Sequence, residues 1–482
     1  MRNMKTMKLM MAIAGAAMAA GLAGCGTVET PETPTRSWVP PASLNREDPV
    51  WQQVRLQTPK PEPGKPLTLA QLVDMALQNS PASRKAWEEA RAASIGVAQA
   101  KAIFAPRVTA VGGLSYDRYE AEGIHNDRNR AAIGPGLELN YLVLNFGGGY
   151  DAAVEQAMQT VYAANFQFNQ TISNTILATE LAYYELASAT VAIDAAVENL
   201  KDAVAVLDAA TKRKDAGMAT KLDVLQAQTI SDQAKFMLEA AKGREKTARG
   251  ALAWAVGIAA DTPFDVVIPE DDATAGINRS EITKLIDDSL ARRSDISALR
   301  AQVAAKEAAV KVAKAAGYPS LYLNGGAYWN EYGYYDGGVR GADRDLDFNA
   351  GISVRWDIFD GSRNRNEQHA ASALARAARE ELRQAELAAG AEVWIAYNAL
   401  DTALAQLESS HSVLVTATEA RRMAGESYQA GMKGILDLIN AETQLANARI
   451  QEITARRAVF STLARLAHAA GSLAKAAPRK AE

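Results

Sequence analysis

One phrase occurs twice in this chain of 482 residues. The stretch KDAGMATKLDVLQAQ occupies residues 214–228, and YQAGMKGILDLINAE occupies residues 428–442. Both contain Ala-Gly-Met, then Leu-Asp with two further apolar residues, then a polar residue and Ala. Neither phrase contains a recognisable catalytic group, so the repetition itself needs an explanation.

The match between the two halves of the chain extends beyond this phrase at a nearly constant spacing. A repeat of about 210 residues is much longer than one unit of a solenoid, so it predicts the duplication of a domain-sized unit. One pair of matching segments aligns Pro106 with Pro319. The matching pairs are LAQLVDMALQNSP (69–81) with ITKLIDDSLARRS (282–294), AKAIFAPRVTAVGG (100–113) with AKAAGYPSLYLNGG (313–326), YLVLNFGG (141–148) with WDIFDGS (356–362), and LAYYEL (181–186) with IAYNAL (395–400).

Each copy is predicted to contain a helix, two strands and a long helical hairpin, in that order. Apolar residues at a spacing of three and four indicate the helix, which ends before the proline because a residue preceding proline disfavours the helical conformation. The fold class is therefore mixed α+β with a duplicated strand–strand–hairpin unit. The predicted segments are a signal peptide (1–24), a proline-rich extended segment (25–66), the first repeat (67–262), a linker (263–281), the second repeat (282–475) and a tail (476–482).

The predicted strands alternate apolar and polar residues, so each has one apolar and one polar face. Each is about ten residues long, which is enough to cross a bilayer at a tilt. Tyr116, Tyr141, Trp329 and Trp356 are expected at strand ends, as in the aromatic girdle of a membrane barrel. A sheet over the core of a soluble protein shows the same alternation, and that alternative stays open. The apolar faces are Val108, Ala110, Gly112, Leu114 and Tyr116; Ile133, Pro135, Leu137, Leu139 and Tyr141; Leu321, Leu323, Gly325, Ala327 and Trp329; and Phe348, Ala350, Ile352, Val354 and Trp356.

Two very long helical stretches follow the strands. No proline occurs from Asp151 to Thr262 or from Gly361 to Ala477. A continuous helix through residues 151–216 would be about 100 Å long. Gly217 and Gly431, near the middle of these stretches, predict the turn of a hairpin, so the duplicated phrase lies at the far end of each hairpin. Heptad spacing predicts a coiled-coil seam along Ile193, Val197, Leu200, Val204 and Leu207.

The N-terminus resembles the signal peptide of a bacterial lipoprotein. Arg2, Lys5 and Lys8 precede an apolar run that ends in Leu-Ala-Gly-Cys, with the one cysteine of the chain at Cys25. The run is too short to span a membrane, so residues 1–24 are predicted to be cleaved. The resemblance to a lipobox implies a covalent lipid on Cys25 and, with no Asp after it, sorting to the outer membrane. A chance cysteine after an ordinary signal peptide is the alternative.

Composition and motifs exclude most other classes of protein. The formal net charge is −4, the four histidines are scattered, and the sequence has no basic cluster of the kind that binds nucleic acid. It has no nucleotide-binding loop or zinc-protease motif, and the GGG at 147–149 lacks the lysine of a phosphate-binding loop. One cysteine excludes a disulfide framework. We therefore predict no enzyme, no metal site, no nucleic-acid partner and no cofactor beyond the lipid on Cys25.

Four strands per chain are too few to close a barrel in a membrane. About eight is the usual minimum, and an open sheet edge in lipid leaves backbone groups without hydrogen bonds. If these strands cross a membrane, several chains must share one barrel, and the hairpins must extend from it as a tube. Such a chain, without any energy-supplying motif, is predicted to be a passive conduit. The alternative is a non-channel lipoprotein scaffold or tether that spans the periplasm, although a tether has no use for two-faced strands.

The sequence resembles the TolC-type outer-membrane efflux and secretion channels and, among them, the lipidated efflux lipoproteins. The resemblance covers residues 65–475 and is carried by the lipobox at Cys25, the duplicated unit, YLVLNFGGG with WDIFDG, and the two tip phrases. It implies a homotrimer whose twelve-stranded outer-membrane β-barrel is continuous with a periplasmic α-helical barrel. It also implies two partners, a periplasmic adaptor protein and an inner-membrane pump. Drug efflux, metal or small-molecule efflux and protein secretion all stay open.

The same resemblance assigns roles at the hairpin tips, which would form the closed gate and the adaptor-docking surface. Tyr428, Lys433 and Asp437 match positions that in this family hold the inner helices together or constrict the bore, and Asp223 is the first-copy partner. Some relatives have a second acidic residue where this chain has Asn440, so a double carboxylate ring is not implied. For Asp223 and Lys433 a helix cap or a solvated side chain is the alternative. The turn residues expected to dock the adaptor are Gly217, Met218, Gly431 and Met432.

Overall fold

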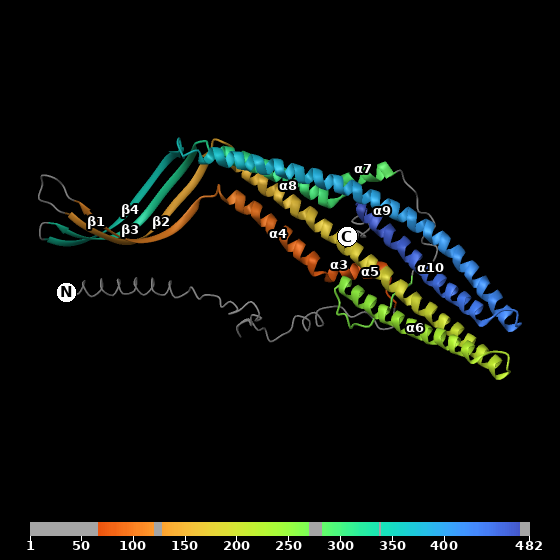
Figure 1. Ribbon diagram of the computed structural model, residues 1–482. Coiled ribbons are helices and arrows are strands. Elements are labelled where there is room, and N and C mark those ends of the chain that lie inside the picture. The colour runs from red at the N-terminus through yellow and green to blue at the C-terminus, as the bar shows by residue number, and fades with distance from the viewer. Residues whose placement is uncertain (1–65, 120–127, 269–281, 337–338, 473–482) are drawn as a thin grey trace. The chain divides into compact units, whose positions relative to one another are not determined.

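The computed structural model describes residues 66–119, 128–268, 282–336 and 339–472 (Figure 1). All of them belong to one compact unit, Thr58–Glu482. The predicted signal peptide, the lipidation site at Cys25, nearly all of the proline-rich segment, most of the linker and the whole tail lie outside the described residues.

Each repeat begins with two helices, so the prediction of a single helix is wrong. In the first repeat the chain bends at Ser80, whose backbone is extended (φ −61°, ψ 118°), and Pro81 begins the next helix. Proline suits the first helical position because its missing N–H would have no partner there, and it pushes Ser80 out of the helical region. The apolar spacing continues across this bend, which hides it in the sequence. The helices are α3 (Leu69–Asn79), α4 (Pro81–Ala102), α7 (Ile282–Arg292) and α8 (Ser294–Ala315).

The second repeat makes the same bend without a proline. Arg293 lies at the bend with an extended backbone (φ −67°, ψ 127°) and a buried side chain. Its guanidinium donates to both carboxylate oxygens of Asp295, at 3.0 and 2.7 Å, and to Glu392 of the following long helix at 2.5 Å. A buried charge is tolerated only when it is paired, so this pairing fixes the bend in place of a proline.

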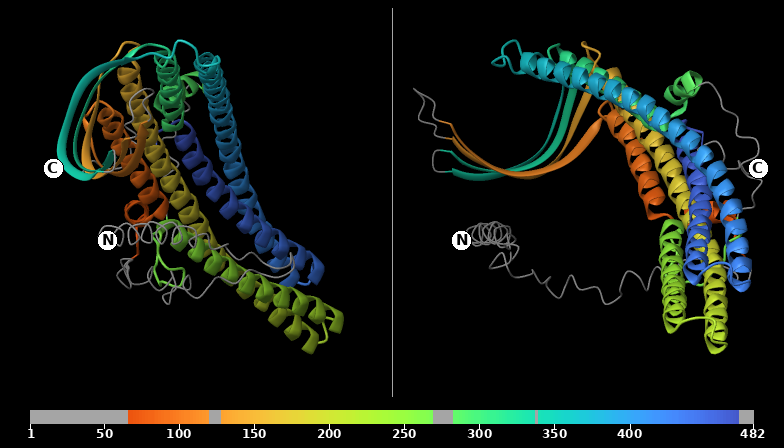
Figure 2. Two further views of the ribbon diagram at one scale, coloured as in Figure 1. Left: turned by 90° about the vertical axis from the view of Figure 1, so that its left-hand side faces the viewer. Right: turned by 45° about the vertical axis from the view of Figure 1, so that its right-hand side comes forward.

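The four strands form one antiparallel sheet in the order β1-β2-β3-β4, which is strongly curved (Figure 2). The central pair joins the two repeats, with Asn140 opposite Asn324. The prediction of two strands per repeat is confirmed, but the strands have 13 to 18 residues and are longer than expected. Their bounds are β1 (Arg107–Tyr119), β2 (Arg128–Asn145), β3 (Ser320–Asp336) and β4 (Val339–Arg355).

Both faces of the sheet are open within the described part of the chain. No described helix packs on it beyond isolated contacts, and one face exposes large apolar side chains. On the other face Asn324 accepts from the Asn140 amide at 3.1 Å and donates to the Ser353 hydroxyl at 2.7 Å. The two-faced pattern is confirmed, and among the described residues there is no soluble core beneath it. The exposed apolar residues include Val108, Leu114, Leu137, Phe348, Ile352 and Val354.

One of the aromatic residues expected at strand ends lies elsewhere, because the strands are longer than predicted. Trp329 lies in the middle of β3, whereas Tyr141 lies in the last part of β2. Tyr116 is in the last part of β1, whereas Trp356 follows the end of β4, where its indole N–H donates to the Gly317 carbonyl at 3.1 Å.

Two helices of 67 residues follow the strands, each about 100 Å long at 1.5 Å per residue. The predicted hairpins are confirmed, because each long helix turns back at a glycine and pairs with a helix of 36 or 35 residues. By length and composition α5 is the one described helix that could cross a membrane, but it far exceeds the ~20 residues of a span. Both hairpins pack through α5 and α10 into one bundle (Figure 1). The helices are α5 (Gly149–Asp215), α6 (Lys221–Val256), α9 (Arg363–Gln429) and α10 (Ile435–Ala469).

The seam along α5 keeps the predicted heptad spacing but lies on a neighbouring face. Val197 and Val204, which were expected in the seam, are exposed, whereas Ala196, Ala203 and Ala210 are buried. Helices that pack through short alanine side chains approach closely and gain dispersion contacts along their backbones. The prediction is therefore wrong for the two valines, which the single chain leaves uncovered, whereas Ile193, Leu200 and Leu207 are partly buried and Leu207 packs against the buried cluster at the tips.

The largest buried cluster lies where α3, α5 and α6 meet, far from the sheet. A parallel bridge between Leu67 and Val266 closes this cluster at one side. Its fully buried members are Leu72, Leu186, Leu252, Ala253 and Val256.

Candidate functional site

The first hairpin tip has a glycine turn and a side-chain cap of its own at the start of α6. The chain leaves α5 through Gly217 (φ +75°), in a left-handed conformation that favours glycine, and the Met218 N–H donates to the Arg213 carbonyl at 2.8 Å. The Thr220 hydroxyl accepts from the Asp223 N–H at 3.3 Å, and the Asp223 carboxylate accepts from the Thr220 N–H at 2.7 Å. Asp223 is thus half of a capping box, which is the helix-cap alternative drawn from the sequence.

The second hairpin tip repeats the turn without a side-chain cap. Gly431 has φ +76°, and the Met432 N–H donates to the Ser427 carbonyl at 2.9 Å. Gly434 precedes α10 and has no side chain that could accept from the first helical turn. Met432 and its counterpart Met218 are 74% and 65% exposed. The glycine turns are confirmed, and the two tips differ in their caps.

Asp437 occupies in α10 the place that Asp223 occupies in α6, but it is not part of a capping box, because the N-cap residue of α10 is Gly434. The Lys433 Nζ lies 3.9 Å from Asp437 Oδ1, and both side chains are about half exposed. An exposed pair of this kind contributes at most about 1 kcal/mol. The Asp437 carboxylate is therefore accessible to solvent and to other chains.

Tyr428 is the buried centre of the contact between the two hairpins. Its side chain is 4% exposed, and the guanidinium of Arg213 lies 4.7 Å from the ring centroid. Arg213 also donates to the carbonyls of Tyr428 and Gln429 in the last turn of α9, and the Tyr428 carbonyl accepts from the Gly431 N–H at 3.1 Å as well. One arginine of the first hairpin thus binds the ring and caps the helix end of the second.

The Tyr428 hydroxyl makes no hydrogen bond within the described residues. Burial raises the pKa of Tyr428, Arg213 opposes this shift and Asp223 adds to it, so the hydroxyl stays protonated. The contact between hairpins that was expected from Tyr428 is therefore made by its ring and backbone. Sequence reasoning did not single out Arg213; its signal is the Lys-Arg-Lys run at 212–214 in the last turn of α5.

An apolar cluster from both hairpins surrounds Tyr428. Full burial of a Leu or Ile side chain contributes about 1.5–3 kcal/mol, more than an exposed ion pair. This cluster and the Arg213 contact, rather than the Lys433–Asp437 pair, hold the tips together. The other buried members of the cluster are Val206, Ala210, Ala227, Ile435, Leu438 and Ile439.

Farther from the tips, four charged residues form what we call the inter-hairpin network: Asp202 of α5, Arg421 of α9, and Glu442 and Arg449 of α10. Arg421 Nε lies 2.6 Å from Glu442 and its Nη2 lies 3.4 Å from Asp202, while Arg449 Nη1 lies 3.1 Å from the other Asp202 oxygen. Burial raises the pKa of Glu442, and the charge of Arg421 opposes that shift. Sequence reasoning did not identify any of these residues.

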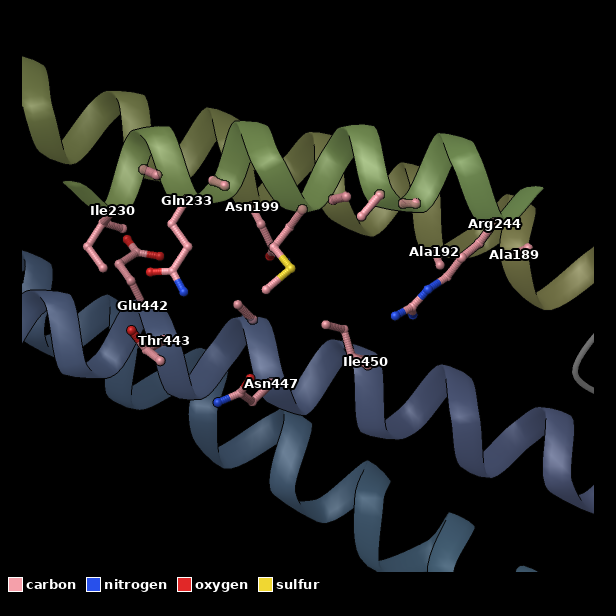
Figure 3. A pocket seen from close by; sticks show the side chains of 17 residues that line it. Ala189, Ala192, Asn199, Ile230, Gln233, Arg244, Glu442, Thr443, Asn447 and Ile450 are labelled. Atoms are coloured by element: carbon pink, nitrogen blue, oxygen red, sulfur yellow. The ribbon is translucent and has the colours of Figure 1, made fainter. Parts of the chain in front are cut away.

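A cavity of about 220 Å³ lies beside this network, between α5, α6 and α10 (Figure 3). Glu442 lies at one end of the cavity and Arg244 at the other (Figure 3). Between these ends the cavity is lined mainly by short apolar side chains. Eight of the lining residues are alanines: Ala189, Ala192, Ala196, Ala203, Ala234, Ala240, Ala241 and Ala446.

The groups at the tips position helices and carry charge. Within the described residues no three His, Cys, Asp or Glu side chains gather closely enough to hold a metal ion. Arg213, Tyr428 and the network bind one hairpin to the other, and Asp437 presents an uncapped carboxylate.

An open two-faced sheet joined to two long helical hairpins defines the class of outer-membrane channels with a helical extension. The chain belongs to the outer membrane efflux protein family, which it matches over residues 72–258 and 285–472. Protein CyaE of Bordetella pertussis is 29% identical over 412 residues, which cover 85% of each chain. The pyoverdine export outer membrane protein OpmQ of Pseudomonas aeruginosa is 28% identical over 406 residues, covering 81% of this chain and 82% of that one.

The fold is that of a solved outer-membrane protein. VceC from Vibrio cholerae superposes with a TM-score of 0.72 at 22% identity, covering 84% of this chain and 96% of VceC. The predicted membership in this family of channels and the predicted role as an outer-membrane efflux or secretion channel are confirmed.

Proposed function

We propose that three copies of this chain form one outer-membrane exit duct, gated at the hairpin tips, anchored by a lipid on Cys25, and fed by an inner-membrane pump through a periplasmic adaptor. The observation that carries the proposal is the four-stranded sheet, whose apolar face is bare and whose β1 and β4 edges have no partner among the described strands. A non-channel tether has no use for such a sheet.

The open edges require further copies of the chain. An unpaired backbone group in hydrocarbon costs several kcal/mol, so a four-stranded sheet is not stable alone in a bilayer. Three copies would join β4 of one chain to β1 of the next in a closed barrel, above the usual minimum of about eight strands. Native mass spectrometry in detergent tests this and should show three chains. A stable monomer that retains its strand signal would overturn the shared barrel.

The gate follows from threefold symmetry. Three Asp437 carboxylates around a narrow axis would form an anionic ring that attracts cations and rejects anions. Such a ring also offers oxygen ligands to a divalent cation, which would hold it shut. In support, the Asp437 side chain is half exposed and uncapped. Single-channel recordings of the reversal potential, with and without Mg²⁺ on the periplasmic side, measure both properties.

The adaptor would dock at the tips. Met218 and Met432 are exposed there, and flexible methionine side chains adapt to apolar partners. A photo-crosslinking amino acid at position 218 or 432 should capture the adaptor in cells, and the same probe at Phe348 on the sheet should not. Equal capture from both places would contradict docking at the tips.

The lipid would add anchorage to a barrel that already holds the trimer in the membrane. Mass spectrometry of the mature N-terminus tests the modification, with a diacylated and N-acylated Cys25 as the expected product. An unmodified Cys25, or cleavage at another bond, would defeat this part of the proposal. Cys25→Ala, placed behind an ordinary signal peptide, should weaken anchoring and leave the trimer intact.

A further inference from the structure

The inter-hairpin network is one of the polar contacts that join the two hairpins away from their tips; Arg457 with Glu185 and His468 with Asn174 are two others. Its two arginines belong to the second hairpin, and both reach one carboxylate of the first. Arg421 and Arg449 contact different oxygens of Asp202, at 3.4 and 3.1 Å, and Arg449 also donates to Asn199 on the same helix. Asp202 is therefore the point of α5 on which α9 and α10 converge.

Burial makes this contact different from the many surface pairs of the same helices. The side chains of Asp202, Arg421 and Arg449 are 22%, 29% and 24% exposed, and that of Glu442 is 7% exposed. Two positive and two negative charges face one another, so the group is balanced only while the hairpins stay together. Removing one partner of a buried charge pair leaves the other uncompensated, which is strongly unfavourable.

The next residue along α9 provides an internal contrast. Arg422 pairs with Glu419 and Glu426, both at 2.5 Å, but all three residues lie on one helix and are more than half exposed. Separation of the hairpins would break the contact of Arg421 with Asp202, keep its contact with Glu442 inside the second hairpin, and leave the contacts of Arg422 unchanged. The chain thus places a structural control beside the residue of interest.

We propose that Asp202 is a positioning residue that clasps the second hairpin to the first and sets the resting closure of the channel, separately from the tip contacts. The proposal rests on the proposed function, in which the hairpins close the periplasmic entrance. Opening the hairpins pulls both arginines off one carboxylate, so the clasp opens as a unit. Glu442 of the network and Asn199, the further partner of Arg449, both line the cavity, so a change of hairpin spacing would alter that cavity.

The test measures closure and hairpin separation in the same variants. Asp202→Asn keeps the shape of the side chain and removes its charge. It should raise the open population in planar bilayers about tenfold, which corresponds to about 1.4 kcal/mol, and should speed amide exchange in α9 around Arg421. Asp202→Glu retains the charge and should restore most of the closure. Arg422→Ala should change neither measurement.

The outcomes separate the clasp from the channel. If the wild-type protein forms no pore, the proposed function fails and the clasp with it. If the wild type conducts and Asp202→Asn speeds exchange without raising the open population, the network is only structural and the clasp is refuted. If the Asp202→Asn variant fails to assemble, the Arg449→Lys variant is measured in its place. Lysine keeps the positive charge of Arg449 but lacks its planar guanidinium. That variant should show a smaller rise in open population, and no rise would refute the clasp.

Discussion

The two hairpin tips have the same turn and share the Ala-Gly-Met and Leu-Asp of the repeated phrase, yet their side chains make different contacts. Gly217 and Gly431 adopt almost the same φ, +75° and +76°. In the first tip Thr220 and Asp223 satisfy each other in a capping box, whereas in the second Gly434 leaves Asp437 uncapped. The two tips thus share one backbone turn, and one N-cap difference leaves the Asp437 carboxylate outside any capping box.

The tips also differ in how they contribute to the joint between the hairpins. The first tip supplies Arg213, a long side chain that reaches outward, and the second supplies the Tyr428 ring and the helix-end carbonyls that receive it. The first tip therefore contributes the charged side chain of this contact, and the second contributes the ring and the helix end. Substitutions in the two tips should affect different measurements.

Arg213→Ala is expected to have the largest effect. It removes the cation–π contact and the bonds to two carbonyls, worth together about 2 kcal/mol, so the resting conductance should rise more than tenfold. The control is Lys212→Ala, since Lys212 is exposed and pairs with Asp208 on its own helix at 2.6 Å. Planar-bilayer recordings measure both. Equal conductance in the two variants would mean that the Arg213 contact does not hold the tips.

The pair Asp437→Ala and Asp223→Ala compares the tips directly. Loss of Asp437 should reduce cation selectivity, because it removes the proposed charge ring, with little effect on stability. Loss of Asp223 should leave selectivity unchanged and lower the free energy of unfolding by about 1 kcal/mol per chain, because it removes a helix cap. Reversal potentials and denaturant titrations separate the two results. The reverse pattern would assign the bore to the first tip.

The sequence predicts those parts of this site that follow from local rules. Gly217 and Gly431 stand out because a left-handed turn favours glycine, and the long helices stand out because proline is missing. Arg213 and the network were not predicted, because their partners are distant in the chain: Arg449 and Asp202 are 247 residues apart. With 52 basic and 56 acidic residues, no spacing rule selects that pair. Asp437 and Tyr428 were identified by resemblance, and only the structure shows that the Tyr428 ring makes the contact.

Similar limits apply to the fold. The alternation of side chains predicts the two-faced strands, but strand length depends on neighbours, and hydrogen bonding to the adjacent strand extends β2 and β3 beyond the alternating stretches. In α5 the heptad spacing is local, whereas the choice of Ala203 over Val204 as the buried residue depends on how closely α6 and α10 approach.

Gly434→Thr is expected to convert the second tip into the first. Gly434 has an extended backbone (φ −80°, ψ 167°), and a Cβ there meets no atom within 4 Å, so threonine should be accepted. The new hydroxyl should cap α10 and draw Asp437 into a capping box, which stabilises the tip by about 1 kcal/mol. Cation selectivity should then fall part of the way toward that of Asp437→Ala. Added stability with unchanged selectivity would show that the cap and the charge ring are independent.

Tyr428→Phe should have a small effect, unlike Tyr428→Ala. The hydroxyl is buried without a hydrogen-bond partner in the described residues, so its removal should leave the free energy of unfolding unchanged or slightly higher. The ring remains under Arg213, and resting conductance should stay near that of the wild type. A large rise in conductance for the phenylalanine variant would mean that the hydroxyl gains a partner from another subunit, and hydrogen exchange near position 428 would then increase as well.

Ser353→Ala is expected to have the smallest effect and fixes where selectivity arises. Ser353 lies on the polar face of β4 and accepts from Asn324 at 2.7 Å, but the pair is exposed, so water replaces the lost bond at a cost of about 0.5 kcal/mol or less. In a wide barrel a missing hydroxyl changes neither the field nor the narrowest diameter, so conductance and reversal potential should match the wild type. The opposite pair of results is the most damaging one: altered selectivity in Ser353→Ala and normal selectivity in Asp437→Ala. The constriction would then lie among the strands, and the difference between the two tips would serve assembly instead of gating.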